Sequence, residues 1–312
     1  LFDSAARSAM MTDFVLRLSD GSLSAEILPE DGGRIAAFWS EAGGNRTDWF
    51  VPRPQPGDSD AGSTAWGSFP LVPFSNRIRD GRFTWDGKEH RITATEKNAS
   101  HAIHGHGRTV PWEVESLSEM RAELSYVYPG DDWPFPYKAR QAFELMDGTL
   151  AISMRLENTG TKAMPSGLGH HPYLPWRSGP LLATSFASIW PAVHGVLPVS
   201  SEGVPRHLDF SRAEERALPR GLDTGFSGWS SHALLHWPKE GLSLEIEGSE
   251  TLSHCILFTP EDKPFFCVEP VTHCIDAINL SAAGVAGTGM QTVPPGGKLV
   301  ASMRFKPVLE AQ

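Results

Sequence analysis

The amino-acid sequence predicts an all-β fold, a large antiparallel β-sandwich, and three observations support that prediction. The 312 residues include 30 glycines and 25 prolines, more than average usage, which indicates many tight turns and few long helices. Apolar residues alternate with polar ones in several runs that are separated by short Gly-containing turns. Helical periodicity is weak throughout, and the best candidate for a short helical turn is Ser211–Ala217.

The predicted elements are hairpins with one buried face, each made of two alternating runs around a turn. The first hairpin has Phe14, Leu16 and Leu18 before the turn Asp20–Gly21 and Leu23, Ala25 and Ile27 after it, and the second has Phe83 and Trp85 before Asp86–Gly87 and Ile92 after it. The third has Phe143 and Leu145 before the turn Asp147–Gly148 and Leu150, Ile152, Met154 and Leu156 after it. The fourth has Ala233, Leu235 and Trp237 before the turn Glu240–Gly241 and Leu242, Leu244 and Ile246 after it. The last strand is expected to carry Leu299, Ala301, Met303 and Phe305.

Two stretches rich in Gly and Pro, residues 52–67 and 195–228, interrupt these patterns. The strand patterns on either side are alike and no change in composition accompanies the stretches, so we interpret both as long loops over one domain. Residues 12–312 are therefore predicted to form a single domain. Residues 1–11 are expected to be an unstructured leader or a remnant of cloning.

The charge and the apolar pattern disfavour several classes of partner. Lys and Arg number 27 against 37 Asp and Glu, and the formal net charge of −10 argues against nucleic acid and anionic membranes and for a small neutral ligand. No run approaches the length of a membrane span and no signal peptide is recognisable, so a cytoplasmic protein is expected. Cys255, Cys267 and Cys274 form no CxxC motif and are expected to be reduced, buried thiols.

Nucleotide-binding motifs are absent from the sequence. There is no GxGxxG after a strand and no GxxxxGK(S/T), so neither a dinucleotide site nor a P-loop is indicated. Gly225–Gly228 is one residue short of a nucleophile elbow, which leaves a serine hydrolase poorly supported.

The histidines of the run His101-x-x-His104-x-His106 raise the hypothesis of a metal site, because alternate residues of a strand share a face and imidazole is a common ligand. No HExxH motif and no second ligand cluster accompanies them, so no metal is expected. The neighbouring Gly105 and Gly107 indicate instead a close approach of a ligand or another strand to this backbone.

Three further residues have an ordinary interpretation when each is considered alone. Arg77 and Asp223 are consistent with surface ion pairs, and His171 with a core histidine that donates to a carbonyl group. Glu269 is different because it follows the apolar run Phe265–Val268, where a carboxylate is desolvated and needs a partner or a function.

Several separated segments together resemble the aldose 1-epimerase (mutarotase) family, in the family's order and over nearly the whole chain. These segments are Gly67–Phe83 with its Asn76-Arg77-Ile78 core, Ile103-His104-Gly105, His171-Pro172-Tyr173-Leu174, Leu222-Asp223, and Glu269 followed by Asp276-Ala277-Ile278-Asn279. One such motif would be weak, whereas five in order make a strong resemblance.

The resemblance implies a galactose mutarotase-like β-sandwich that holds a sugar across a concave sheet face. It also implies a cofactor-free interconversion of the α and β anomers of an aldose. Family roles carried to matching positions make Glu269 the general base, His171 the general acid and His104 an aid at the ring oxygen. The residues implied to hold sugar hydroxyls are Asn76, Arg77 and Asp223.

Two alternatives stay open. One is a carbohydrate-binding or sensor protein that keeps the fold without turnover, although the presence of both an acid and a base argues against it. The other is an epimerase for a phosphorylated or sulfonated sugar, with positive charge supplied by Arg79, Arg82 and Arg108.

Trp133 or Trp229 could stack on the apolar face of a sugar, although most of the ten tryptophans are expected to pack in the core or in loops.

Overall fold

The computed structural model describes residues 14–55, 57–58, 63–93, 100–193, 197–211 and 216–309. The leader expected at residues 1–11, and residues 212–215 of the predicted helical turn, lie outside the described residues. Directly after that gap, Arg216 and Ala217 form a strand, so the described end of the predicted turn is not helical. The single domain expected over residues 12–312 stays a prediction.

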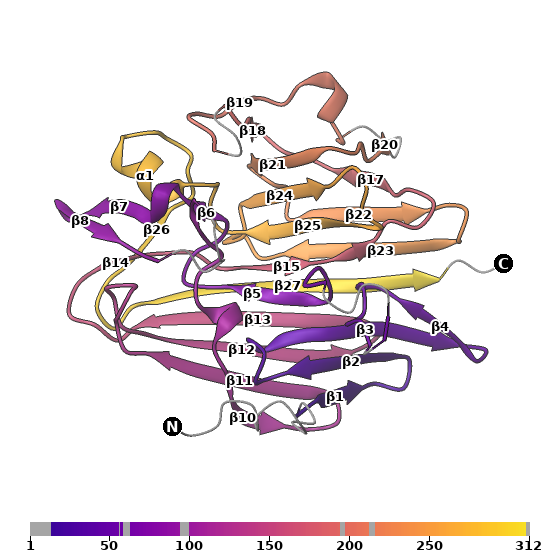
Figure 1. Ribbon diagram of the computed structural model, residues 1–312. Helices are drawn as coiled ribbons and strands as arrows, with labels where there is room; N and C mark the ends of the chain where they lie inside the picture. The colour runs from indigo at the N-terminus through magenta and orange to yellow at the C-terminus, as the bar shows by residue number, and fades with distance from the viewer. Residues whose placement is uncertain are drawn as a thin grey trace.

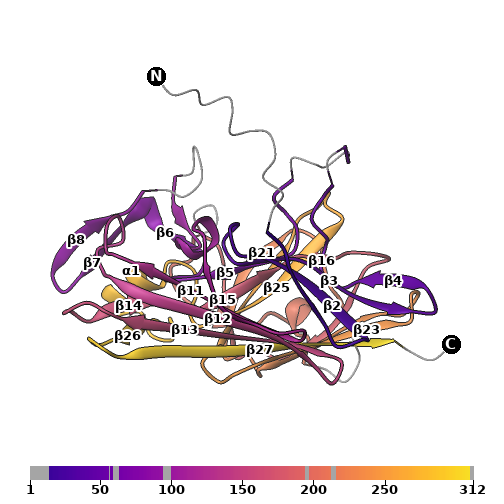
Figure 2. The same ribbon diagram turned by 90° about the horizontal axis from the view of Figure 1, so that it is seen from below.

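Two large antiparallel sheets dominate the structure, and Figure 2 shows them as stacked layers. Among the described residues the larger sheet has twelve strands and the smaller one nine. The larger sheet contains, in spatial order, β1 (Leu16–Ser19), β2 (Leu23–Leu28), β3 (Arg34–Ala42), β5 (Ser68–Leu71), β15 (Gly169–Pro172), β25 (Phe265–Val271), β24 (His254–Thr259), β21 (Leu222–Ser227), β18 (Ser188–Trp190) and β19 (Glu202–Gly203), with β4 (Asn45–Asp48) on β3 and β16 (Leu174–Pro175) on β25. The smaller sheet contains β10 (Glu113–Leu117), β11 (Arg121–Tyr128), β12 (Tyr137–Met146), β13 (Thr149–Asn158), β27 (Lys298–Leu309), β23 (Leu242–Gly248), β22 (His232–Trp237), β17 (Leu181–Thr184) and β20 (Arg216–Ala217).

Short elements complete the described fold, as Figure 1 shows. They are the strand pairs β6 (Arg77–Ile78) with β9 (Ala102–Ile103), β7 (Arg82–Trp85) with β8 (Lys88–Arg91), and β14 (Met164–Ser166) with β26 (Gln291–Val293), the 3₁₀ turns Arg79–Gly81, Gly107–Thr109 and Arg206–Leu208, and helix α1 (Ala277–Ala282). The described part of the chain has no helix with the length and apolarity that crossing a membrane requires.

The inner faces of the two sheets pack against each other in a continuous apolar core. Phe50 illustrates the contact, because its ring centre lies 5.2 Å from that of Phe38 on β3 and 5.0 Å from that of Phe305 on β27. Alternate residues of a strand point to opposite faces, so the period-2 pattern of the sequence gives each sheet one inner and one outer face. The predicted all-β sandwich is confirmed.

All four predicted hairpins form, as β1–β2, β7–β8, β12–β13 and β22–β23. At the β12–β13 turn, Asp147 and Gly148 have φ angles of +53° and +68°, the left-handed pair that joins twisted strands over two residues. The predicted last strand is β27. Phe14 differs from the prediction, because it precedes β1 and is exposed.

Two parts of the chain differ from the sequence interpretation. Residues 195–228 are not one long loop, because β19, β20 and β21 lie within them. The sequence of β21, LDTGFS, lacks a regular apolar alternation, and its signal was therefore missed. Helix α1 was also missed, since six residues are too few to show helical periodicity. The described residues of 52–67 contain neither helix nor strand, as predicted for a loop.

Candidate active site

The larger sheet brings His171 and Glu269 into contact. Strands β15 and β25 are antiparallel neighbours in which Gly169 pairs with Val271, and continuing that register places His171 opposite Glu269. The Nε2 atom of His171 lies 3.3 Å from Oε1 of Glu269. The two strands lie side by side in Figure 1 although the chain between them is long. We call these two residues the His171–Glu269 pair.

Neighbouring side chains show that the pair lies on the outer face of the larger sheet. The ring centre of His170 is 6.4 Å from that of Phe143 on β12, so His170 points into the sandwich. His171 follows it on the same strand and therefore points outward. On β25, Val268 belongs to the core between the sheets, and Glu269 consequently points to the same outer face as His171.

Both members of the pair are nearly inaccessible to water. His171 keeps 6% of its surface exposed and Glu269 keeps 1%. Burial raises the pKa of Glu269 well above its usual value, Asp223 raises it further, and Arg77 lowers it. Burial lowers the pKa of His171 to about 3, and the positive charge of Arg34 adds to this effect. Burial therefore favours an uncharged pair that shares one proton.

Two aromatic rings fix the orientation of the His171 imidazole. Phe69 pairs with His171 across β5 and β15, and its ring stacks on the imidazole with centres 4.6 Å apart and planes inclined by 26°. The ring centre of Tyr173 lies 4.7 Å from that of His171. Phe69 was missed as a site residue, although it lies in the segment Gly67–Phe83 that carries the family resemblance.

Asn76 and His104 form a second part of the site. The backbone N–H of His104 donates to the carbonyl oxygen of Asn76 over 2.9 Å, and the backbone N–H of Asn76 donates to Nδ1 of His104 over 3.3 Å. Since Nδ1 accepts, neutral His104 carries its proton on Nε2. Its ring lies edge-on to His171 with centres 5.2 Å apart. Burial lowers the pKa of His104 well below its usual value, which keeps the ring neutral.

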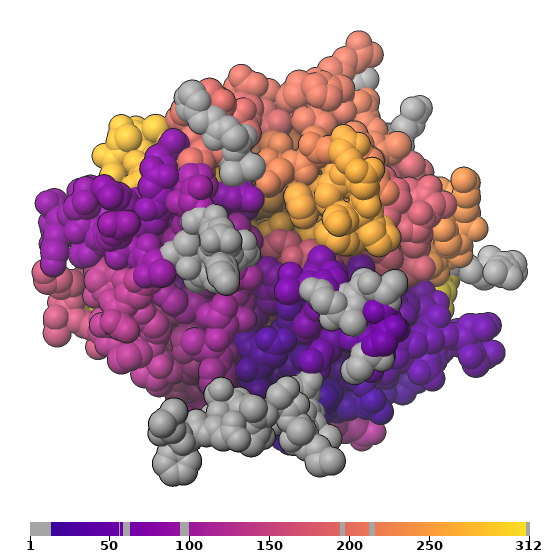
Figure 3. Space-filling model, viewed as in Figure 1, coloured from indigo at the N-terminus to yellow at the C-terminus, as the bar shows by residue number. Residues whose placement is uncertain are grey.

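Arg77 connects Asn76 to the larger sheet. Its backbone N–H and its Nη1 donate to Oδ1 of Asn76 over 2.9 and 3.2 Å. The same Nη1 lies 3.4 Å from Oδ2 of Asp223 on β21, and both side chains stay partly exposed, by 22% and 26%. The space-filling view in Figure 3 shows purple segments from the first third of the chain beside orange segments from the last third. All six residues singled out in the sequence therefore belong to one connected group of side chains.

The histidine run does not converge into a metal site within the described ranges. His101 turns to Asp80, whose backbone N–H donates to its Nδ1 over 3.0 Å, and His106 stacks on Tyr128 with ring centres 4.7 Å apart. Only His104 reaches the His171–Glu269 pair. His104 and His106 do not share a strand face, as the metal hypothesis required, because His104 has a φ of +65° and interrupts the strand.

The glycines of the same run explain how His104 is held. Gly105 has a φ of +66°, and a Cβ atom there would lie 2.2 Å from the carbonyl oxygen of Val72. A Cβ atom on Gly107 would lie 2.3 Å from Cγ1 of Val72. The close approach indicated by these glycines is therefore made by the chain at Val72, and it positions the His104 backbone against Asn76.

The tryptophans considered for sugar stacking are packed in the interior. Trp133 is fully buried, with its ring centre 5.2 Å from that of Phe83. Trp229 is also buried, and its indole N–H donates to Oγ1 of Thr184 over 2.9 Å. Both rings are therefore packed in the interior, as expected for most tryptophans.

His171, Cys267 and Glu269 form a group that could hold a metal ion, as judged over the described residues. Their donor atoms all lie within 4.8 Å of one another. Cys267 precedes Glu269 by two residues on β25 and so shares its face. Cys267 is a buried free thiol, as predicted, but its place beside Glu269 was not predicted. The spacing of two residues between Cys267 and Glu269 was the sequence signal that could have predicted this, because alternate residues of a strand share a face.

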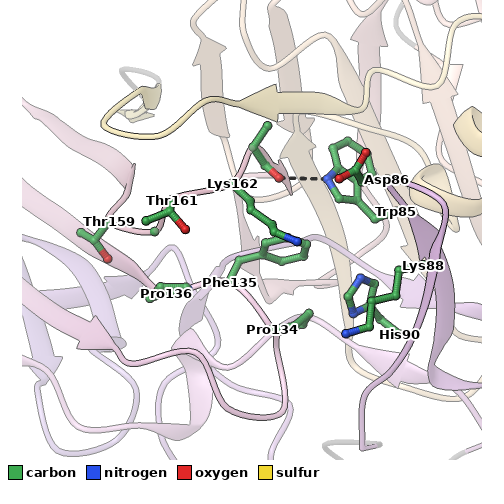
Figure 4. A pocket seen from close by; sticks show the side chains of 12 residues that line it. Trp85, Asp86, Lys88, His90, Pro134, Phe135, Pro136, Thr159, Thr161 and Lys162 are labelled. Atoms are coloured by element: carbon green, nitrogen blue, oxygen red, sulfur yellow. Dashed lines mark hydrogen bonds between the residues drawn. The ribbon is translucent and has the colours of Figure 1, made fainter.

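A cavity of about 780 Å³ lies apart from this group, between the β7–β8 hairpin and the loop that follows β13 (Figure 4). Lys88, His90, Phe135 and Lys162 are among the residues that line it, and none of the six residues of the candidate site does. This cavity and the cluster of titratable groups with shifted pKa values are therefore different places.

Comparison with known proteins reveals relatives along nearly the entire chain. The family model described as Aldose 1-epimerase matches residues 15–306. The uncharacterized protein YphB of Escherichia coli K12 is 30% identical over 271 residues, which cover 84% of this chain and 89% of YphB.

Solved structures share the fold. A protein of Escherichia coli K12, described provisionally as an aldose 1-epimerase, superposes with a TM-score of 0.82 at 28% identity over 95% of this chain and 99% of that one. A galactose mutarotase-like protein of Clostridium acetobutylicum superposes with a TM-score of 0.81 at 18% identity over 94% of each chain, a likeness of fold alone. Given the family match across residues 15–306 and a relative at 30% identity, this chain belongs to the aldose 1-epimerase family.

Proposed function

We propose that the protein is an aldose 1-epimerase that interconverts the α and β anomers of a hexose or a related aldose. The observation that carries the proposal is the 3.3 Å contact between Oε1 of Glu269 and Nε2 of His171. Anomer exchange needs one proton to leave the C1 hydroxyl while another reaches the ring oxygen. A carboxyl and an imidazole in contact supply both functions near neutral pH.

In the proposed cycle Glu269 is the general base and His171 the general acid. The Glu269 carboxylate accepts the proton of the C1 hydroxyl, and protonated His171 donates to the ring oxygen as the C1–O5 bond breaks. The open aldehyde rotates about C1–C2 and closes on its other carbonyl face while the two groups exchange roles. The pair carries one proton throughout, on His171 with the closed sugar and on Glu269 with the open one, so the cycle needs no cofactor.

Burial of the pair favours this proton transfer. The pKa shifts of Glu269 and His171 both oppose ionisation, so the ion pair is the less stable arrangement and the transfer that opens the ring relieves it. Arg77 counteracts part of this cost at Glu269, because its positive charge favours the carboxylate. A positioned acid and a positioned base each contribute about 10²–10⁴-fold to a rate.

Four neighbouring side chains are proposed to hold the sugar. The Nε2–H group of His104 is a neutral donor suited to an oxygen that gains negative charge, the ring oxygen in this reaction. Arg77 and Asp223 offer charged donors and acceptors to hydroxyl groups. Asn76 contributes its amide Nδ2, because Oδ1 already accepts two hydrogen bonds from Arg77.

A second candidate substrate is an aldose that carries an anionic group, and arginines around Phe69 favour it. The guanidinium carbons of Arg34 and Arg108 lie 5.1 and 5.4 Å from the ring centre of Phe69, which itself stacks on His171. Arg34 is about nine-tenths buried, and its Nε has no hydrogen-bond partner. Guanidinium groups bind phosphate, carboxylate and sulfonate groups well because their donors are planar and permanently charged.

Two of the arginines considered for an anionic sugar are an ion-pair partner and an exposed side chain. Nε of Arg79 lies 3.2 Å from Oδ2 of Asp276, an ion pair next to helix α1. Arg82 is exposed on β7. Of the three arginines expected from the sequence, Arg108 alone lies near Phe69.

Rate measurements on a small sugar panel test both candidates. We expect the purified protein to accelerate the polarimetric mutarotation of at least one freshly dissolved neutral aldose. A preference of tenfold or more in kcat/KM for a phosphorylated or sulfonated counterpart would favour the anionic substrate. Sugar binding without any acceleration on either class would instead support a sensor protein and refute the proposed enzyme.

A further inference from the structure

Three donor atoms of different chemistry converge on the outer face of the larger sheet. His171 on β15 offers a ring nitrogen, Cys267 on β25 a sulfur and Glu269 on β25 a carboxylate oxygen, all within 4.8 Å of one another. All three residues are buried, with Cys267 and Glu269 almost completely enclosed. The mechanism proposed above uses the imidazole and the carboxylate but assigns no role to the thiol.

Two polar atoms of this group lack a partner. Oε2 of Glu269 and Nδ1 of His171 are buried and accept or donate no hydrogen bond. An unsatisfied buried polar atom costs about 1–3 kcal/mol, so its presence in a native structure points to a missing ligand or a functional need. Sugar hydroxyls can meet both needs, whereas a metal ion held between the two side chains can meet that of the Glu269 oxygen.

The spacing of the group suits a tetrahedral ion. Two ligands bound at about 2.0–2.1 Å with tetrahedral geometry lie about 3.3 Å apart, which is the separation of His171 Nε2 and Glu269 Oε1. A Zn–S bond of about 2.3 Å requires the sulfur to be about 3.6 Å from each of them. The Cys267 sulfur lies within 4.8 Å of a His171 ring nitrogen and of a Glu269 carboxylate oxygen. It therefore reaches this geometry by a shift on the order of 1 Å.

We propose that His171, Cys267 and Glu269 form a binding site for a thiophilic divalent cation, Zn²⁺, and that the bound ion inhibits the protein. Nitrogen, sulfur and oxygen together are a donor set that Zn²⁺ accepts, and three protein ligands leave a fourth position for water. The inhibition rests on the proposed function, because two of the ligands are the proposed acid and base. A coordinated imidazole cannot donate to the ring oxygen, and a coordinated carboxylate is a poor base.

The site differs from one that holds a resident metal. Metal-bound histidines almost always donate from the second ring nitrogen to a carboxylate or a carbonyl group. Nδ1 of His171 has no such partner. The ion is therefore a reversible competitor of the sugar.

Inhibition by zinc chloride in a non-chelating buffer tests the proposal on the full chain. We expect micromolar Zn²⁺ to reduce the mutarotation rate, excess chelator to restore it, and Cys267→Ser to raise the half-inhibiting concentration at least tenfold. Cys274→Ser is the matched control, because Cys274 is also buried and lies outside the group; it should keep the sensitivity of the unmodified protein. Equal sensitivity in both variants, or no inhibition at millimolar Zn²⁺, would overturn the proposal.

Cobalt binding gives a readout that does not depend on turnover. Co²⁺ bound by a thiolate shows a sulfur-to-metal charge-transfer band in the near ultraviolet. The band should form in the unmodified protein and in Cys274→Ser and be lost in Cys267→Ser. A protein that shows the band but no mutarotation refutes the proposed function and keeps the site, whereas mutarotation without the band in any form refutes the site alone.

Discussion

Replacing Glu269 by Gln removes the proposed base with little change in shape. Glu269 is 1% exposed, so a substitution that changed its volume would leave a cavity or a clash, and the amide avoids both. The amide cannot accept the proton of the C1 hydroxyl. Since a positioned base contributes about 10²–10⁴-fold, we expect kcat to fall by that factor, a loss of about 3–5 kcal/mol in transition-state stabilisation.

The assay is the polarimetric rate of a freshly dissolved α-aldose, corrected for the spontaneous reaction. Thermal unfolding is followed in parallel, and we expect a change in stability below about 1 kcal/mol, because no buried volume is lost and the amide has no charge to desolvate. Glu247→Gln is a matched control on β23, where Glu247 is half exposed and pairs with Arg304 at 3.7 Å; its rate should equal that of the unmodified protein. A rate for Glu269→Gln within threefold of the unmodified protein, with the fold intact, would refute Glu269 as the base.

Three further outcomes are expected. His171→Asn should lower kcat far more than it raises KM, as measured by initial polarimetric rates, because the proposed acid acts in the transition state; a change in KM alone would assign His171 to binding. Asp223→Asn removes a negative charge that raises the pKa of Glu269. Both limbs of the pH profile of kcat/KM should therefore move to lower pH. A profile that stays in place or moves to higher pH would contradict this coupling. Gly105→Ala places a Cβ atom 2.2 Å from a backbone oxygen at a φ of +66° and should cost about 1–3 kcal/mol or more in denaturant unfolding. Gly148→Ala, with a similar φ and no atom within 4 Å, is the control, and an equal loss in both variants would show that the close contact is harmless.

Local patterns in the sequence were sufficient to predict the hairpins, because the inner faces and the tight turns depend on neighbouring residues. The β12–β13 hairpin has its alternating runs and its Asp147-Gly148 turn within one short stretch of chain. Helix α1 was missed for the complementary reason, since its six residues are fixed by packing and not by a repeated pattern.

The geometry of the candidate site depends on contacts between distant segments, and motifs alone could not supply it. His171 and Glu269 meet through the register of β15 and β25, which no local pattern specifies. The histidines of the run lie apart because a positive φ at His104 interrupts the strand, which the sequence spacing does not reveal. The family resemblance identified residue types in the right order, whereas the stacking of Phe69 and the place of Cys267 required three-dimensional coordinates.

Saturation-transfer NMR at anomeric equilibrium tests the central claim most directly, because it detects exchange without any net reaction. With catalytic amounts of the unmodified protein, irradiation of the α-anomeric proton of a substrate aldose should reduce the β-anomeric signal, and Glu269→Gln should abolish that transfer. Line broadening of the sugar signals without transfer, for every neutral and anionic aldose in the panel, would show a protein that binds sugars and does not interconvert their anomers.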